Sequence, residues 1–108
     1  MENKRPTPVV GALIFNPKGK LLLTKAVKWD GYYTIPGGHI EFKETMKEAL
    51  RREVKEETNL DIFDINFLCV KDCILPKNYH RKKHFLLLDF VCKSKSSRVE
   101  LNDESKDF

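Results

Sequence analysis

Residues 38–60, GHIEFKETMKEALRREVKEETNL, contain the pattern that decides the fold of this chain. Residues 44–57 are rich in strong helix formers and include neither Gly nor Pro. Apolar residues recur there at helical spacing: Met46, Ala49, Leu50 and Val54. Asn59 follows at the point where a helix end favours a left-handed residue. The stretch therefore predicts one amphipathic helix.

Two carboxylates lie on the same face of this predicted helix as its apolar residues. At about 100° per residue, Glu53 and Glu57 fall in the sector that carries Met46 and Leu50. They form a like-charge pair four residues apart, and with Glu56 they lie near the helix C-terminus, where the dipole favours cations. A divalent cation would offset these penalties, and a set of hard oxygen ligands favours Mg²⁺ or Mn²⁺. The alternative is a solvated acidic surface.

Apolar segments on both sides of the helix predict strands. They are residues 9–15, 21–27, 62–75 (one or two strands) and 84–93. The first two segments flank a turn signal at residues 16–19 and are expected to form a hairpin. Residues 36–38, Pro-Gly-Gly, are expected to interrupt regular structure, and residues 76–83 to form a basic loop. The elements predict an α/β fold in which a single helix covers only one face of the sheet.

The composition predicts a single domain spanning residues 1–108. A 41% hydrophobic share is enough for one core, and two cores would be hard to fill at this length. The net charge of +4 suits a phosphate-bearing ligand. Neither a membrane-spanning apolar run nor a signal peptide is recognisable, and three cysteines do not make a disulfide framework. A cytoplasmic location is therefore expected.

The motif in residues 38–60 resembles the Nudix box, Gly-x5-Glu-x7-Arg-Glu-U-x-Glu-Glu-x-Gly-U, in which U is a bulky aliphatic residue. The matching residues are Gly38, Glu44, Arg52, Glu53, Val54, Glu56, Glu57 and Leu60. Asn59 stands where the family has Gly, and Asn also tolerates a positive φ. The resemblance implies a mixed β-sheet packed between helices. Residues 99–108 resemble only the start of the C-terminal strand and helix of such domains, so three alternatives stay open: a truncated domain, a short gene product, or a partner that supplies the missing cover.

The resemblance also implies an activity, hydrolysis of the pyrophosphate bond in a nucleoside diphosphate linked to another group. The implied ligands of Mg²⁺ or Mn²⁺ are the Gly37 carbonyl, Glu53, Glu56 and Glu57. Arg52 would orient Glu53, and Glu44 would support the site from the helix start. Glu53 is the first candidate for helping to deprotonate water, although some family members place the base in a later loop. Glu104 falls where some members carry an extra acidic residue, and it is not assigned to the site.

Contacts with a nucleotide substrate are expected outside the acidic helix. The candidates are Gly38, Trp29, Tyr32 and Arg81. Glycine lets a backbone approach a phosphate closely. The two aromatic rings could stack on a base or merely anchor a loop. Arg81 lies in the basic run 80–84, which could hold phosphates or simply be a solvated loop.

Four other hypotheses follow from the sequence. A catalytically weak or inactive nucleotide-binding or regulatory module is the main rival to an enzyme, and a basic loop alone would suggest RNA decapping. An uncovered sheet face favours a homodimer. A zinc site is disfavoured, because Cys69 and Cys73 lie four residues apart in a predicted strand and would be about 13 Å apart. The two thiols are expected to be buried among apolar residues.

Overall fold

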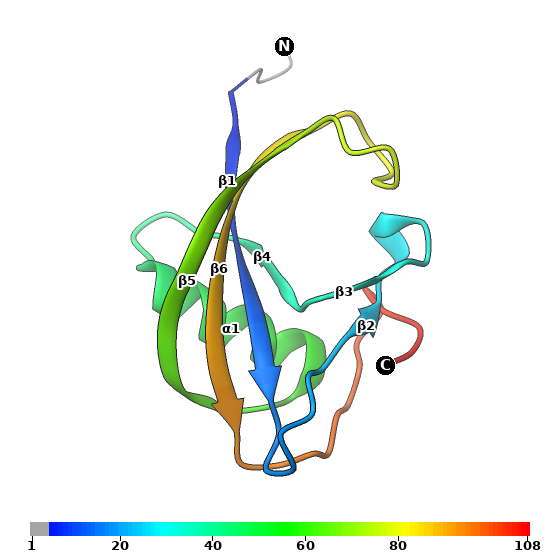
Figure 1. Cartoon of the computed structure of the whole chain (residues 1–108). Helices are drawn as coiled ribbons and strands as arrows, with labels where there is room; N and C mark the ends of the chain where they lie inside the picture. The colour runs from blue at the N-terminus through cyan, green and yellow to red at the C-terminus, as the bar shows by residue number, and fades with distance from the viewer. Residues whose placement is uncertain (1–4) are drawn as a thin grey trace.

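The computed structural model describes residues 5–108, which form a mixed four-stranded sheet with one long helix packed against it (Figure 1). The strands of this sheet are β1 (Thr7–Phe15), β4 (Gly37–His39), β5 (Ile62–Ile74) and β6 (His84–Ser94). Their spatial order is β4-β1-β6-β5. The central pair β1–β6 is parallel, and the two outer pairs are antiparallel. The predicted mixed sheet is therefore confirmed.

Helix α1 (Met46–Thr58) is the predicted amphipathic helix. Thr45 begins it through a capping box, because its side chain accepts a hydrogen bond from the Glu48 N–H while the Glu48 carboxylate accepts one from the Thr45 N–H. Asn59 ends the helix in a left-handed conformation, with φ 61°. The Asn that replaces the Gly of the box therefore adopts the conformation that Gly favours.

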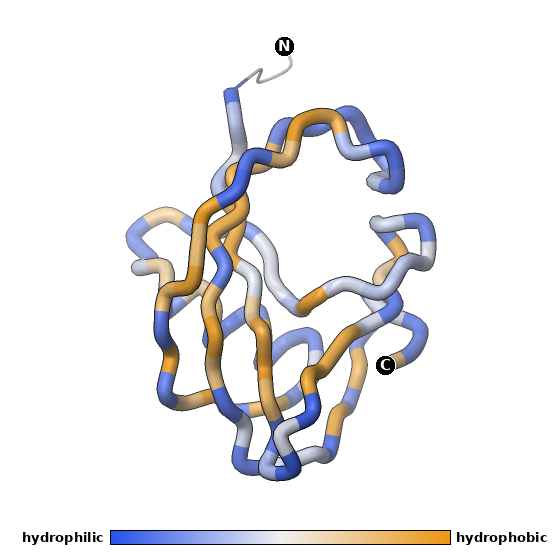
Figure 2. The backbone as a smooth tube through the Cα atoms, viewed as in Figure 1, coloured by the Kyte–Doolittle hydropathy of each residue, from blue (hydrophilic) through white to orange (hydrophobic). Residues whose placement is uncertain are grey.

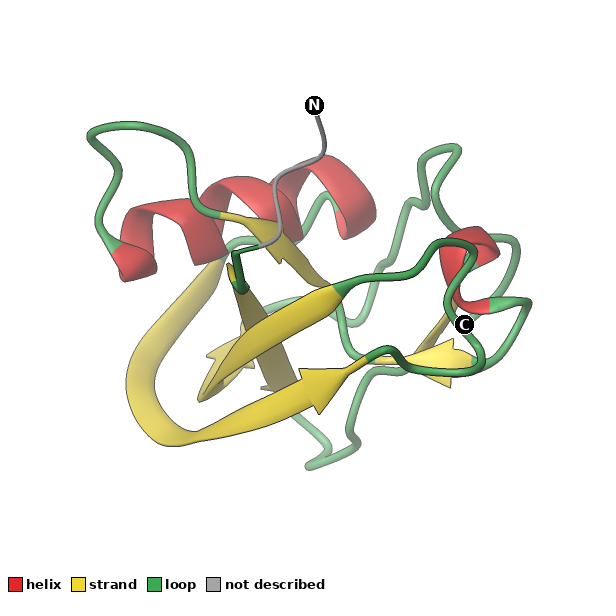
Figure 3. Cartoon of the chain, turned by 90° about the horizontal axis from the view of Figure 1, so that it is seen from above, coloured by secondary structure: helices red, strands yellow, loops and turns green. Residues whose placement is uncertain are grey.

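The hydrophobic core lies between α1 and one face of the sheet (Figure 3). Ala49, Leu50 and Val54 of α1 pack there and are fully buried. The sheet contributes alternate residues of its central strands: Val10, Ala12, Ile14, Phe90 and Cys92. Along the backbone, apolar residues are concentrated on the strands and polar residues on the connections (Figure 2). One helix face and one sheet face thus make up the core.

Two local predictions about the first half of the chain are wrong. Residues 37–39 do not interrupt regular structure but form β4, which pairs with β1. Residues 21–27 do not complete a hairpin with β1. They make one bridge, Phe15 with Leu21, and then form β2 (Thr24–Lys25), which pairs with β3 (Tyr33–Thr34). The physical reason is competition, because β4 occupies this edge of β1 at residues 9–11 and leaves only the end of β1, where the Leu22 N–H donates to the Ile14 carbonyl at 3.0 Å.

The long strand β5 lies at the edge of the sheet. It is one continuous strand with two irregularities in its pairing with β6. Cys69 and Cys73 on this strand are half-buried, so the prediction of buried thiols is wrong. An edge strand lacks a neighbour on one side, which leaves its side chains more accessible. Neither cysteine belongs to a potential metal-binding group within residues 5–108.

A second, smaller layer lies on the side of β4 and β1 where the C-terminus is found (Figure 1). It contains β2, β3 and the short 3-10 helix η1 (Val27–Trp29). The C-terminal segment, residues 104–107, runs beside β2. The Lys25 N–H donates to the Asp107 carbonyl at 2.7 Å, and the Lys106 N–H donates to the Lys25 carbonyl at 2.9 Å. In residues 5–108, no helix is long and apolar enough to cross a membrane.

Candidate active site

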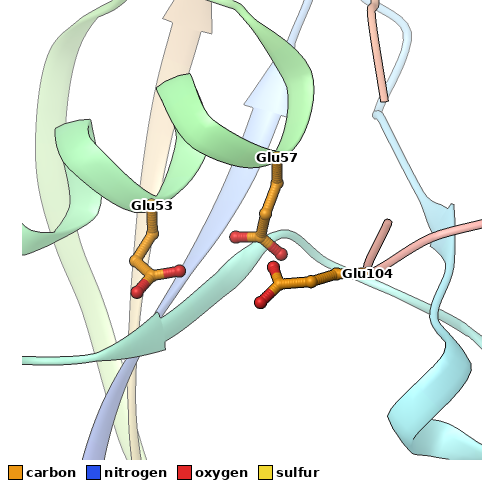
Figure 4. A group of neighbouring side chains, drawn as sticks. All are labelled: Glu53, Glu57 and Glu104. Atoms are coloured by element: carbon orange, nitrogen blue, oxygen red, sulfur yellow. The ribbon is translucent and has the colours of Figure 1, made fainter. Parts of the chain in front are cut away.

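Three carboxylates converge beside β4. Glu53 and Glu57 project from α1, and Glu104 reaches toward them from the C-terminal segment (Figure 4). Oxygen atoms of all three lie within 4.8 Å of one another. Glu57 is buried, Glu53 is largely buried and Glu104 is exposed. Two of the three members are glutamates that the sequence placed on the apolar face of the helix.

Glu104 is the member of this cluster that the sequence did not assign. The Val27 N–H donates to the Glu104 carbonyl at 2.9 Å, and Ser105 bridges to Ala26. These backbone contacts hold the C-terminal segment against η1 and carry the Glu104 side chain to α1. The only sign of Glu104's role in the sequence is its acidic side chain in a late loop. Its position beside α1 could not be predicted, because the pairing that places it joins segments that are distant in the chain.

Burial and repulsion change the ionisation of the cluster. Burial, together with the charges of Glu104 and Glu53, raises the pKa of Glu57 to about 9. The Gly37 N–H opposes this shift by donating to Glu57 Oε2 at 3.1 Å. Burial also raises the pKa of Glu53, against the lowering effect of Arg52. Glu57 therefore keeps its proton near neutral pH in the absence of metal, and a cation would compensate its charge once that proton is removed.

Arg52 connects the acidic cluster to the chain around it. Its Nε donates to Glu44 Oε2 at 2.7 Å, and its Nη1 donates to Glu53 Oε1 at 2.9 Å. Its Nη2 also donates to the His39 carbonyl at 2.9 Å. These carboxylates raise the pKa of the Arg52 guanidinium, while Arg52 lowers the pKa of Glu44. The arrangement fixes one oxygen of Glu53 and leaves the carboxylate facing the cluster.

Glu56 takes a different position from the other glutamates of the box. Its side chain is 54% exposed, and its nearest cation is Arg52, at 3.3 Å. The structure does not bring its oxygens into the group formed by Glu53, Glu57 and Glu104. Of the ligands implied by the resemblance, the structure brings Glu53 and Glu57 together, with Glu104 beside them, and the roles of Glu56 and the Gly37 carbonyl stay predictions.

The glycines of β4 make room for these side chains. A Cβ on Gly38 would lie 2.5 Å from the Glu53 carboxyl carbon, and a Cβ on Gly37 would collide with the Val10 carbonyl oxygen. Only glycine therefore lets the carboxylates lie directly against this strand. The result is a cradle of carboxylate oxygens around a narrow space.

The donor set fits a hard divalent cation. It consists of carboxylate oxygens, without nitrogen or sulfur, which is the preference of Mg²⁺ and Mn²⁺ rather than zinc. Within residues 5–108, no basic side chain forms an ion pair with Glu57 or Glu104, so Glu53, through Arg52, is the one carboxylate of the cluster that the protein pairs with a cation.

The cluster opens into a cavity of about 300 Å³. Gly37, Gly38 and the three carboxylates line one part of it. Alternate strand residues line another part, on the sheet face opposite α1: Val9, Phe85, Leu87 and Asp89. This volume is at the lower end of the range for small-molecule sites, roughly 300–1,000 Å³. The second face of the sheet thus carries a cavity.

The candidate substrate contacts separate into two groups. Gly38 and Trp29 line the cavity. Tyr32 and Arg81 are exposed and lie outside its lining. Tyr79, which the sequence did not assign, lines the cavity and packs edge-on against Trp29, with ring centroids 4.7 Å apart. This contact joins two loops that no local pattern relates.

Comparison with known proteins agrees with this geometry. Residues 5–108 match the NUDIX domain family. Nucleoside triphosphatase NudI from Salmonella heidelberg (strain SL476) is 33% identical over 114 residues, covering 96% of this chain and 80% of that protein. The 8-oxo-dGDP phosphatase NUDT18 from Danio rerio is 39% identical over 66 residues, which span 59% of this chain but only 20% of that protein.

The fold has solved counterparts as well. The MutT protein from Methanosarcina mazei Go1 has a TM-score of 0.77 and 26% identity, covering 98% of this chain and 77% of that one. Because the family match extends over residues 5–108 and NudI aligns along most of its own length, this chain belongs to the Nudix hydrolase family.

Proposed function

We propose that this chain hydrolyses the pyrophosphate bond of a nucleoside diphosphate or triphosphate with a divalent cation held by Glu53, Glu57 and Glu104. The observation that carries the proposal is the convergence of these carboxylates, within 4.8 Å of one another, at the mouth of a cavity. Within the described residues Arg52 pairs with Glu53, whereas no basic side chain pairs with Glu57 or Glu104, and the oxygens of all three suit Mg²⁺ or Mn²⁺. Nucleoside triphosphatase NudI, a relative along most of the chain, is consistent with this substrate class.

The side chains of the site have separate roles in the proposal. When bound, a divalent cation supplies charge neutralisation for the pyrophosphate and makes water more acidic. Arg52 holds Glu53 in place, and Glu44 holds Arg52. Glu53 accepts the proton of the attacking water as the new P–O bond forms and the bridging P–O bond breaks. Burial raises the pKa of Glu53, which makes its carboxylate a stronger proton acceptor than an exposed glutamate.

The remaining contacts position the substrate. Gly38 leaves room for the Glu53 carboxylate against the strand and lines the cavity in which the substrate phosphates would lie. Trp29 supplies an aromatic wall in the same cavity. Tyr32 and Arg81 have no part in the proposal, because they lie outside the cavity. The cation is expected to be required for phosphate binding, since the pyrophosphate would otherwise meet three carboxylates.

Turnover of a nucleotide panel in the presence of Mg²⁺ tests the proposal. We expect release of phosphate, pyrophosphate or a nucleoside monophosphate, identified by mass spectrometry, and loss of this release with EDTA. Glu57→Gln should lower kcat at least about a hundredfold while circular dichroism stays unchanged. Glu100→Gln is the matched control, because Glu100 is exposed and contacts Asn59 instead of the cluster. Full activity of Glu57→Gln would contradict the site.

A nucleotide-binding module without turnover is the second candidate. It would keep the cavity and the cation but release no product. Calorimetry with a nucleoside diphosphate and Mg²⁺, run beside the turnover assay, separates the two functions. Binding without product would favour the module. The buried Glu53 held by Arg52 favours the enzyme, because a module that only binds does not need an oriented proton acceptor.

A further inference from the structure

An ion pair between a buried carboxylate and an exposed lysine lies in the cavity apart from the glutamate cluster. Asp89 of β6 is only 5% exposed, although its residue type is rarely buried without a partner. Lys71 of β5 contacts it, with Nζ 3.0 Å from Asp89 Oδ2, and the Lys71 side chain is 57% exposed. Both residues line the cavity. A carboxylate and an ammonium group are thus offered side by side to whatever occupies it.

The sheet register places this pair at a suitable distance from the glutamates. Gly37, Gly11 and Asp89 are cross-strand neighbours on β4, β1 and β6. Two inter-strand spacings separate the ends of this row, which is roughly 10 Å. A Cβ on Gly11 would lie 2.8 Å from Asp89 Oδ1, so glycine there lets the carboxylate lean across β1. The Gly37 N–H also donates to Glu57 Oε2, so this row leads from the glutamate cluster to Asp89 over a distance comparable with that between the phosphates and the base of a nucleotide.

Aromatic and aliphatic side chains flank the pair. Trp29, Tyr79 and Phe85 form one cluster, with the Tyr79 and Phe85 ring centroids 4.9 Å apart and the rings nearly perpendicular. Leu87 lies between Phe85 and Asp89 on the same face of β6. Such walls suit a flat heterocycle, whose polar edge would then meet Asp89 and Lys71.

We propose that Asp89 and Lys71 read the base of the substrate and select a guanine-type edge. The inference rests on the proposed function, because it assumes that the phosphates lie at the glutamate cluster. The pair presents one donor followed by two acceptors: the Lys71 ammonium and the two Asp89 oxygens. A guanine edge presents the complement, the O6 acceptor followed by the N1–H and N2–H donors.

The other bases match this arrangement less well. Hypoxanthine has no donor at position 2 and therefore leaves one Asp89 oxygen without a partner. Xanthine and uracil place a carbonyl oxygen against that oxygen, which is repulsive. Adenine and cytosine each present one donor beside an acceptor, and so they satisfy only one oxygen of Asp89. An unmatched buried carboxylate is costly, so the selection should be strong.

Values of kcat/KM for GTP, ITP, XTP and ATP with Mg²⁺ test the inference directly. We expect GTP to exceed each of the other three by about tenfold or more. In Asp89→Asn the amide accepts from N1–H and donates to the xanthine O2, so XTP should become at least as good as GTP. Equal kcat/KM for GTP, ITP and XTP in the wild type, or unchanged ratios in Asp89→Asn, would overturn the inference.

Lys71→Met provides a second variant that does not depend on a buried residue. It should lower kcat/KM for GTP about tenfold through KM and leave kcat nearly unchanged, because Lys71 contacts only the base. Lys93→Met is the matched control: Lys93 forms a surface ion pair with Asp64 and lies outside the cavity. An equal loss in both variants would contradict the role of Lys71.

Calorimetry with GMP, IMP and XMP separates the two proposals. A preference for GMP without turnover of any triphosphate would support the base contacts and reject the hydrolase. Turnover of all triphosphates at one rate, with equal affinity for the three monophosphates, would support the hydrolase and reject the base contacts.

Discussion

Glu57 combines deep burial with two acidic neighbours. The backbone N–H of Gly37 is the one hydrogen-bond donor to its carboxylate within residues 5–108. The carboxyl therefore prefers its neutral form, and its pKa of about 9 lies above the ordinary value of 4.5. A residue with this preference is poorly suited to a structural role at neutral pH, where an apolar side chain would be less costly. The position of Glu57 is explained if a bound cation replaces the proton and compensates the charge of the carboxylate.

This preference predicts how stability changes with pH. Between about pH 4.5 and 9 the folded state keeps a proton on Glu57 that the unfolded state releases, so the free energy of unfolding of the metal-free protein should fall as pH rises. The expected decrease is of the order of a few kcal/mol. Urea denaturation in EDTA at several pH values measures it. Millimolar Mg²⁺ should restore stability, most strongly at high pH.

Two variants control that experiment. Glu57→Gln should flatten the pH dependence, because its amide has no proton to lose. Glu100→Gln should keep it, since Glu100 is exposed and remote from the cluster. Stability that rises with pH in the metal-free wild type would show that Glu57 is not held in its neutral form.

At the scale of single elements, α1 was predictable because its signals are local. The apolar spacing and Asn59 lie within one short stretch of the chain, and the structure confirms both, while the capping box at Thr45 is an equally local signal that the prediction did not use. The orientation of Glu53 and Glu57 toward one face follows from the same periodicity. The family resemblance added the role of Arg52, and the structure shows the implied contact with Glu53.

The elements that the sequence misjudged depend on distant partners. β4 is a run of glycines and a histidine, which has low strand propensity, and it pairs because β1 offers a free edge that only glycine can approach so closely. In the sequence, Asp89 is an unexplained charge inside an apolar strand. The structure explains it, because Lys71 pairs with its carboxylate and Gly11 leaves room for it. No window of the sequence contains these neighbours together.

The C-terminal segment gives a prediction at this scale. Lys106→Pro removes the N–H that donates to the Lys25 carbonyl, and it should loosen the segment that carries Glu104. We expect the affinity for Mn²⁺, measured by calorimetry, to fall about tenfold while α1 stays folded. Lys106→Ala keeps the N–H and should bind normally. Equal affinities in the two variants would mean that this pairing does not position Glu104.

At the scale of the whole molecule, the two faces of the sheet have different roles. One face packs against α1 to make the core, and the other face lines the cavity. The sequence correctly indicated that one helix would cover one face. It could not indicate that η1 and the β5–β6 loop would meet over the other through Trp29 and Tyr79, because that contact is purely tertiary.

The homodimer expected from the sequence stays a prediction. The strand β5 lies at the sheet edge and exposes several large apolar side chains: Phe67, Leu68, Val70 and Ile74. Pairing of two such edges would cover them. Sedimentation equilibrium should then show a concentration-dependent dimer that Val70→Lys shifts toward monomer, whereas Val27→Lys, an exposed site on η1, does not. A monomer at all concentrations would contradict the prediction.

The parallel pairing of β1 with β6 also has a kinetic consequence. The pairing joins Thr7 to Phe85, and thus nearly opposite ends of the chain. Such a long-range contact requires a large loop to close, and the entropy of closure is lost before the contacts of the ladder stabilise the chain, which slows folding. During synthesis, α1 can form its local hydrogen bonds early, whereas the central ladder must wait until β6 has left the ribosome. The acidic helix then forms before β6 and the segment that carries Glu104 are available. Binding of metal or nucleotide should therefore begin only when the last quarter of the polypeptide has emerged.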